Sequence, residues 1–169
     1  VDHADQETFT TGGTAVDLAI AWPNAVVADG ANGLVLVNID GDLQLTGTAG
    51  PPQFNSNFQS VDVAGNYAYV IDANGTFRVY DLTDPSGPIA LGTLALKGML
   101  AVAVHGNHAF VACGEDGLRV IDVTDPNAPV FVGTEFYETA DLAQSVEVYG
   151  DFLYVAVSGS GVQMLAIQP

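Results

Sequence analysis

Residues 60–93 read SVDVAGNYAYVIDANGTFRVYDLTDPSGPIALGT, and residues 101–134 repeat the pattern as AVAVHGNHAFVACGEDGLRVIDVTDPNAPVFVGT. The pattern returns from Ser145 without its last part, and in a looser form from Ala15. The four copies therefore begin 41 to 45 residues apart. A period in the low forties, made of short β-like runs, is typical of the blades of a β-propeller.

Each copy contains short apolar runs that are rich in β-branched and aromatic residues, which favour strands. In the second copy we expect strands at residues 61–64, 67–71, 77–82 and 89–94. Turn-forming pairs separate them, namely Gly65-Asn66, Asn74-Gly75 and Asp84-Pro85. No segment has the 3.6-residue apolar period of a helix. The sequence therefore predicts an all-β propeller of four blades of about 42 residues, with four antiparallel strands in each blade.

The last copy stops after its third strand, and a lone β-like run at residues 7–11 precedes the first copy. We therefore predict a closing strand within residues 1–13 and a propeller domain at residues 14–169. That strand would complete the last blade, within the chain or in a neighbouring chain, and would cover sheet edges that favour aggregation. The residues that would exchange are Thr8, Phe9 and Thr10.

The second and third copies carry a family resemblance. The phrases SVDVAGNYAYVID and GLRVIDVTDPNAPVFVG resemble the LVIVD repeat, whose name is close to the sequence of residues 118–122. The resemblance covers about residues 14–168, and the first copy departs from it at residues 20–24 (IAWPN), which we interpret as an inserted loop. It implies a β-propeller of a secreted or cell-surface protein, and it says little about activity because one fold can host many functions.

The charge of the chain is strongly acidic. Twenty Asp and Glu residues face three Lys and Arg residues, which gives a net charge of −17. Such a surface repels nucleic acids and anionic lipids, so we exclude both as partners. No run of apolar residues is long enough for a transmembrane helix. Three explanations of the acidity stay open: adaptation to high salt (a halophilic protein), cation binding, and the use of Asp in turns.

A first candidate site is a ring of acids on the innermost strands. Asp17, Asp62 and Glu147 lie two residues after the start of each copy, whereas the third copy has Ala103. If the first strand of each blade lines the channel, these carboxylates converge there. They could hold a hard cation such as Ca²⁺, the one cofactor that the sequence suggests, or they could bond to neighbouring backbone and water.

Three smaller motifs have simpler interpretations. His105 and His108 face each other across a two-residue turn, where two Zn²⁺ ligands or a stacked pair both fit, and stacking is favoured because the other copies have flat rings there. Residues 38–42 (NIDGD) resemble part of a calcium loop, but a Gly-centred turn is favoured because the distal Glu is absent. Cys113, the single cysteine, is expected to be a buried and inert thiol.

The loops at residues 49–59 and 135–144 are the longest between copies and are rich in aromatic residues. Loops of unequal length on a regular scaffold are where function is usually placed. We therefore predict a binding rim, unless these rings instead cap the core. Its candidate residues are Phe54, Phe58, Phe136 and Tyr137, with Trp22 as a further stacking platform or core plug.

These observations favour a non-enzymatic, extracellular or cell-surface propeller that binds a protein or a glycan. One alternative is a structural subunit of an assembly or filament joined by terminal strand exchange. Another is a metal-assisted hydrolase or lyase that uses the three channel acids. No nucleophile elbow, phosphate loop or paired-cysteine site supports an enzyme.

Overall fold

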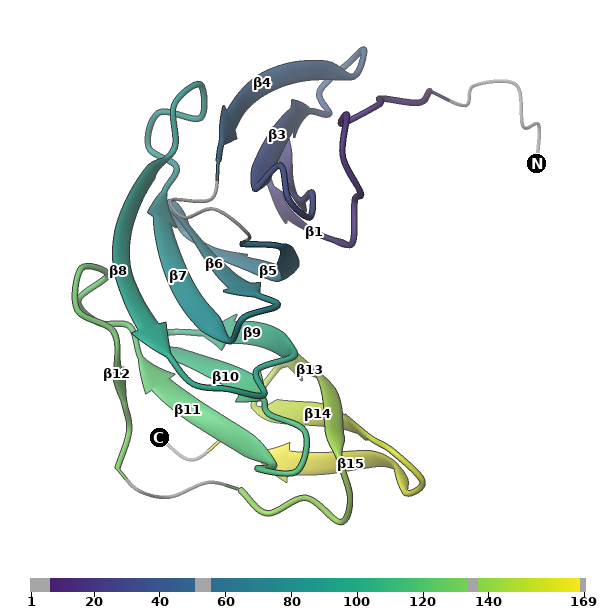
Figure 1. Ribbon diagram of the computed structural model, residues 1–169, viewed down its shortest axis with the longest axis vertical. Coiled ribbons are helices and arrows are strands. Elements are labelled where there is room, and N and C mark those ends of the chain that lie inside the picture. The colour runs from purple at the N-terminus through teal and green to yellow at the C-terminus, as the bar shows by residue number, and fades with distance from the viewer. Residues whose placement is uncertain (1–6, 51–55, 134–136, 168–169) are drawn as a thin grey trace.

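The computed structural model describes residues 7–50, 56–133 and 137–167. This part of the chain folds into four antiparallel sheets and contains no helix, as the sequence predicted (Figure 1). It therefore also contains no helix long and apolar enough to cross a membrane. Each sheet is one copy of the repeat.

The strands follow one another from the inside of each blade to its outside. Blade 1 consists of β1 (Asp17–Ala21), β2 (Asn24–Ala28), β3 (Leu34–Asn38) and β4 (Gln44–Ala49). Blade 2 consists of β5 (Phe58–Ala64), β6 (Tyr67–Asp72), β7 (Thr76–Asp81) and β8 (Ile89–Ala95). Blade 3 consists of β9 (Ala101–His105), β10 (His108–Ala112), β11 (Leu118–Asp122) and β12 (Val130–Phe131). Blade 4 has three described strands, β13 (Ala143–Tyr149), β14 (Phe152–Val157) and β15 (Gly161–Ala166).

The four blades form an arc that is not closed into a ring (Figure 1). The inner strands β1, β5, β9 and β13 succeed one another along the arc, and each contacts the next. Blades 1 and 4 lie at its two ends. The predicted blade count and strand order are thus confirmed, whereas closure of the ring stays a prediction.

Apolar side chains fill the space between neighbouring blades. Because side chains alternate across a strand, each sheet presents one face to the blade before it and one to the blade after it. In blade 2, Val70 packs toward blade 1, and the adjacent Ile71 packs toward blade 3. Strands that are buried on both faces explain why their sequences read as nearly continuous apolar runs.

Phe58 belongs to this core and not to a binding rim. Its side chain is 0% exposed and meets Tyr80 edge to face, with 6.0 Å between the ring centres. The prediction that Phe58 is a surface contact residue was therefore wrong, and the alternative of a ring that caps the core is correct for it. The physical reason is that β5 begins at Phe58, so this ring lies between blades 1 and 2.

The segment before β1 does not form the predicted strand. Residues 7–11 have no strand assignment and lie against blade 1, the blade that follows them in the chain. Phe9 packs on a cluster of Val27, Val35 and Val37, and the Thr11 hydroxyl donates to Asp29 Oδ1 over 2.6 Å. Burial of Phe9 therefore fixes this segment, and within the described residues it does not complete blade 4.

The turn between β1 and β2 also differs from the sequence interpretation. Trp22 and Pro23 form a two-residue connection, joined by a cis peptide bond, between the paired residues Ala21 and Asn24. They occupy the place of Gly65-Asn66 in blade 2. Residues 20–24 are therefore not an insertion, and Pro in the turn concealed an ordinary hairpin.

Many aspartates serve as turn formers. Asp81 Oδ1 accepts a hydrogen bond from the Thr83 amide over 2.7 Å, and Asp122 does the same for Thr124 over 2.8 Å. Asn38 plays this role for Asp40 in the NIDGD segment, where Gly41 has φ of 102°. A side-chain oxygen that bonds the backbone two residues on is the reason that Asp and Asn favour turns. The turn interpretation of this segment is thus correct, and turn use explains part of the Asp content.

Truncation of the core ring tests the reassignment of Phe58. Phe58→Ala is expected to lower the free energy of unfolding by about 3–5 kcal/mol, because it leaves a cavity between two blades. Tyr149→Ala, at an exposed ring, is expected to change it by less than about 0.5 kcal/mol. Urea denaturation measures both values, and equal small losses would mean that Phe58 is not part of the core.

Candidate functional site

The inner strands carry acceptor side chains that bind the backbone of the next blade. Asp17 Oδ2 accepts a hydrogen bond from the Val61 amide over 3.0 Å, and Asp62 Oδ2 accepts one from the Val104 amide over 2.6 Å. Ser60 Oγ accepts from the Val102 amide over 3.2 Å. These amides lie on the inner edge of their sheets, where no further strand can pair with them. The channel carboxylates therefore satisfy backbone donors that would otherwise be unpaired.

The predicted ring of acids is staggered. Strand pairing places Asp62 opposite Tyr69 and Glu147 opposite Tyr154, at equivalent positions of blades 2 and 4. Asp17 instead pairs with Ala28, and so occupies the position of Ser60, two residues earlier. A shift of two residues keeps a side chain on the same face of a strand. Asp17 therefore still faces the channel, but one level away from the other two acids.

The three acids nevertheless influence one another. Burial raises the pKa of Asp62, and the charge of Asp17 raises it further, although hydrogen bonds from Val104 and Val63 oppose this. The pKa of Glu147 is raised by burial first and then by the charges of Asp62 and Asp17. All three line a channel of about 280 Å³, together with residues of all four inner strands. Protonation is therefore easier here than on the surface.

The described residues offer no metal centre. No three His, Cys, Asp or Glu side chains within residues 7–50, 56–133 and 137–167 are close enough together to hold an ion. Both oxygens of Asp62 accept backbone hydrogen bonds, from Val63 and from Val104. Backbone bonding, the second of the two interpretations of these acids, is therefore what the geometry supports.

The remaining candidates, His105, His108 and Cys113, make structural contacts. His105 and His108 are cross-strand partners as predicted, and His108 lies 6.5 Å from Phe110 between ring centres. Cys113 is buried, and burial raises its thiol pKa to about 12, which makes it a poor nucleophile at neutral pH.

A buried ion pair in blade 2 was missed at the sequence level. Arg78 Nη2 lies 2.9 Å from Asp72 Oδ2, and both side chains are almost fully buried. Asp72 also accepts hydrogen bonds from the amides of Asn74 and Thr76, so it fixes the turn that it precedes. The sequence does contain a signal for this pair, because Arg78 is one of only three Lys and Arg residues and lies within a predicted strand.

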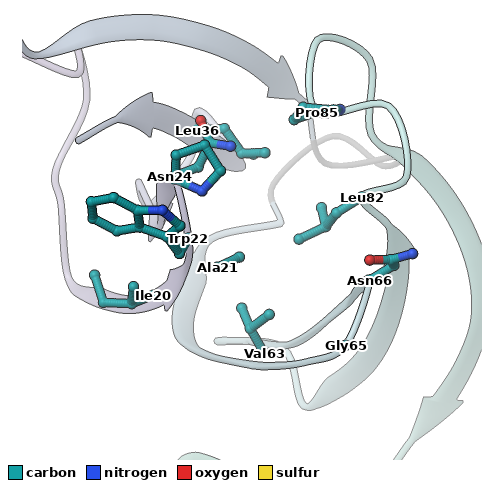
Figure 2. Close-up of a pocket in the computed structure, with 11 residues that line it drawn as sticks. Ile20, Ala21, Trp22, Asn24, Leu36, Val63, Gly65, Asn66, Leu82 and Pro85 are labelled. Carbon is teal, nitrogen blue, oxygen red and sulfur yellow. The ribbon is translucent and has the colours of Figure 1, made fainter. Parts of the chain in front are cut away.

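A cleft of about 390 Å³ separates the β1–β2 turn of blade 1 from the β5–β6 turn and the β7–β8 loop of blade 2 (Figure 2). Trp22 is one of its lining residues and is 69% exposed. Ile20 and Asn24 lie with Trp22 on the blade 1 side. The blade 2 side is made by Val63, Asn66, Leu82 and Pro85. The cleft thus combines apolar walls with two amide side chains.

The structure separates the predicted rim residues. Trp22 lies in the turn that follows the inner strand β1. The predicted rim loops at residues 49–59 and 135–144 instead precede the inner strands β5 and β13. Tyr137 is partly exposed and pairs through its backbone with Leu118 at the outside of blade 3. Phe54 and Phe136 lie outside the described residues. Among the rim residues that the structure describes, Trp22 therefore lines a cleft, and the neighbours that complete this cleft were not predicted because they come from another blade.

Comparison with protein families identifies the repeat. The LVIVD repeat model matches residues 57–95, 100–136 and 142–165. The chain belongs to the LVIVD-repeat family. The unmatched first copy is the one whose hairpin turn contains Trp22 and Pro23.

Similar solved structures agree with the fold. The computationally designed Ika4 protein is 12% identical and superimposes with a TM-score of 0.72, covering 94% of each chain. BamB from Moraxella catarrhalis is 14% identical with a TM-score of 0.65, over 94% of this chain and 48% of that one. A chain of a mitotic checkpoint complex is 15% identical with a TM-score of 0.69, over 91% and 48%. The LVIVD chain thus spans nearly all of one similar propeller and about half of two others. A comparison with curated protein sequences found no match.

Two aspartates are expected to give opposite pH effects. Because the folded-state pKa of Asp62 is raised above its ordinary value of 3.8, ionisation above that pH destabilises the fold. Asp62→Asn, which keeps one acceptor oxygen and loses the other, should therefore gain stability relative to the wild type as the pH rises above 3.8. Hydrogen bonds from Thr83 lower the pKa of Asp81, so Asp81→Asn should be less stable than the wild type at pH 7, with the difference lost as the pH falls.

Urea denaturation of the two variants and the wild type between pH 3 and pH 7 measures these differences. The comparison with Asp81→Asn controls for the general loss of charge repulsion in acid. A stability of Asp62→Asn relative to the wild type that does not rise with pH would contradict the assignment of a raised pKa to the channel acid.

Proposed function

We propose that the chain is a non-enzymatic protein-interaction module that binds an extended peptide segment of a partner in the Trp22 cleft. The observation that supports this proposal is the exposed Trp22 at a cleft between two blades. Tryptophan is costly to leave in water and is enriched at the centres of protein interfaces. One of the similar propellers is, by its name, part of a multiprotein complex.

The chemistry of the cleft suits a peptide. Ala21, Val63 and Leu82 offer apolar contact area, and Pro85 adds a rigid wall. The exposed amide of Asn66 can donate to and accept from a peptide backbone, whereas Asn24 is buried and its Oδ1 accepts from the Thr46 hydroxyl. An extended segment with an apolar anchor and backbone hydrogen bonds fits this combination.

The net charge of −17 favours a partner segment with Lys or Arg beside its apolar anchor. Long-range attraction would speed the association, and added salt would slow it. A cationic side chain could also stack on the face of Trp22, which is a favourable contact for an exposed ring.

Selection of peptides tests the proposal directly. Random twelve-residue peptides displayed on phage are selected on the immobilised wild-type protein, and the winners are titrated into it in solution. Trp22 is the only tryptophan, so its fluorescence reports on this cleft alone. We expect selected peptides with an apolar residue and a basic residue to shift the emission of Trp22.

Substitution supplies the control. Trp22→Ala is expected to weaken these peptides at least about tenfold by calorimetry, since aromatic anchors usually cost more than 1 kcal/mol when truncated. Tyr149→Ala, at an exposed ring beside the β13–β14 turn, should leave the affinity unchanged. Peptides that bind both variants equally, or a protein that binds only oligosaccharides at Trp22, would contradict a peptide-binding cleft.

A further inference from the structure

Blade 4 presents a face that every other blade buries. In blades 1 to 3, the pairs Ala28–Leu34, Ile71–Phe77 and Ala112–Leu118 face the following blade and are 0% exposed. The equivalent pair in blade 4 is Ala156–Val162, in which Val162 is 70% exposed. Met164 is also exposed, although its equivalents Leu36 and Val79 are buried. We call Ala156, Val162 and Met164 the trailing face.

Blade 1 presents the opposite face. Val61, Val102 and Val146 of the other inner strands pack against the preceding blade and are 4%, 5% and 3% exposed. Strand pairing makes Leu18 their equivalent, and it is 58% exposed. Ile20, equivalent to the half-buried Val63, is exposed as well. We call Leu18 and Ile20 the leading face.

The two faces also match in their hydrogen-bonding groups. At each of the first two junctions, side-chain oxygens of one inner strand accept from amides of the next, as Asp62 does from Val104. In blade 4 the acceptors at the equivalent positions are Ser145 and Glu147. In blade 1 the amides at the equivalent donor positions are those of Leu18, which donates to Asp17 Oδ1 of its own strand over 2.9 Å, and of Ile20. The acceptor of blade 4 that corresponds to the Ile20 amide is Glu147.

We propose that the trailing face of one chain binds the leading face of a second copy of the chain. The contact continues the blade-to-blade packing that the chain already makes three times. In the described structure the arc is open, and Leu18 and Val162 are both more than half exposed, so the two faces do not cover each other. Two of the similar propellers are about twice as long as this chain, which is the length that two copies supply.

The same contact accounts for the segment before β1. Phe9 holds residues 7–11 against the outer part of blade 1. At the junction between blades 2 and 3, the outer strand β8 takes the corresponding place against blade 3 through Leu91 and Leu94. A second copy therefore brings its own residues 7–11 toward the unpaired edge of β15. Thr8, Phe9 and Thr10 would then supply the fourth strand of blade 4 without leaving their place on blade 1.

The solution mass tests this contact. Light scattering after size exclusion is expected to give at least twice the chain mass of 17.5 kDa for the wild type at about 2 M salt. A smaller mass is expected at low salt, because the net charge of −17 then repels the copies. A mass of 17.5 kDa under both conditions, up to about 1 mM protein, overturns the proposal and favours a ring closed within one chain.

Single substitutions at either face make the test specific. Val162→Asp and Leu18→Asp should each reduce the mass of the wild-type assembly, whereas Ile89→Asp, at an exposed residue of β8, should not. A mixture of Val162→Asp and Leu18→Asp proteins should form a dimer, since each keeps the face that the other lacks. No association in the mixture, with circular dichroism showing both variants folded, contradicts a head-to-tail contact. Met164→Asp replaces Val162→Asp if the latter is unfolded.

Discussion

The unpaired inner edge of each sheet is the constraint on which this propeller depends. The first strand of a blade pairs with the second on one side only, so alternate amides such as those of Val61 and Val104 point toward the channel. A buried amide without a partner costs roughly as much as a lost hydrogen bond. Asp17, Asp62 and Ser60 provide partners from the preceding blade, and so couple neighbouring blades at the axis while apolar clusters couple them farther out.

The junctions differ in how they use this device. The junction between blades 3 and 4 has Ala101 and Ala103 at the acceptor positions, and it relies on packing around Phe110 and Leu153. Asp62 and Glu147 have raised pKa values because burial disfavours their charge. Asp62 therefore couples two blades through its hydrogen bond to Val104, although the burial of its charge costs free energy. These bonds give the channel a structural role, and the binding that we propose lies at the rims and ends of the arc.

Much of this architecture could be predicted because each repeat contains its own turn signals. Gly65-Asn66 and Asp84-Pro85 mark hairpins by their backbone preferences alone. Three features could not be predicted in the same way. The Trp22-Pro23 turn lacks those signals, Phe58 looks like a loop residue until its strand is known, and Phe9 depends on the distant Val27, Val35 and Val37. For the same reason, the sequence predicted only the Trp22 side of the cleft, since its second wall comes from blade 2.

Amide hydrogen exchange measured by NMR tests the role of the inner-edge bonds most directly. The amides of Val61 and Val102 face Asp17 and Ser60, whereas the equivalent amide of Val146 follows a blade that has Ala101 at that position. All three valines are buried on inner strands, so they form a matched set. If side-chain acceptors satisfy the inner edge, Val61 and Val102 exchange at least about tenfold more slowly than Val146, a difference of about 1.4 kcal/mol in protection. Equal exchange rates at Val102 and Val146 would contradict the account.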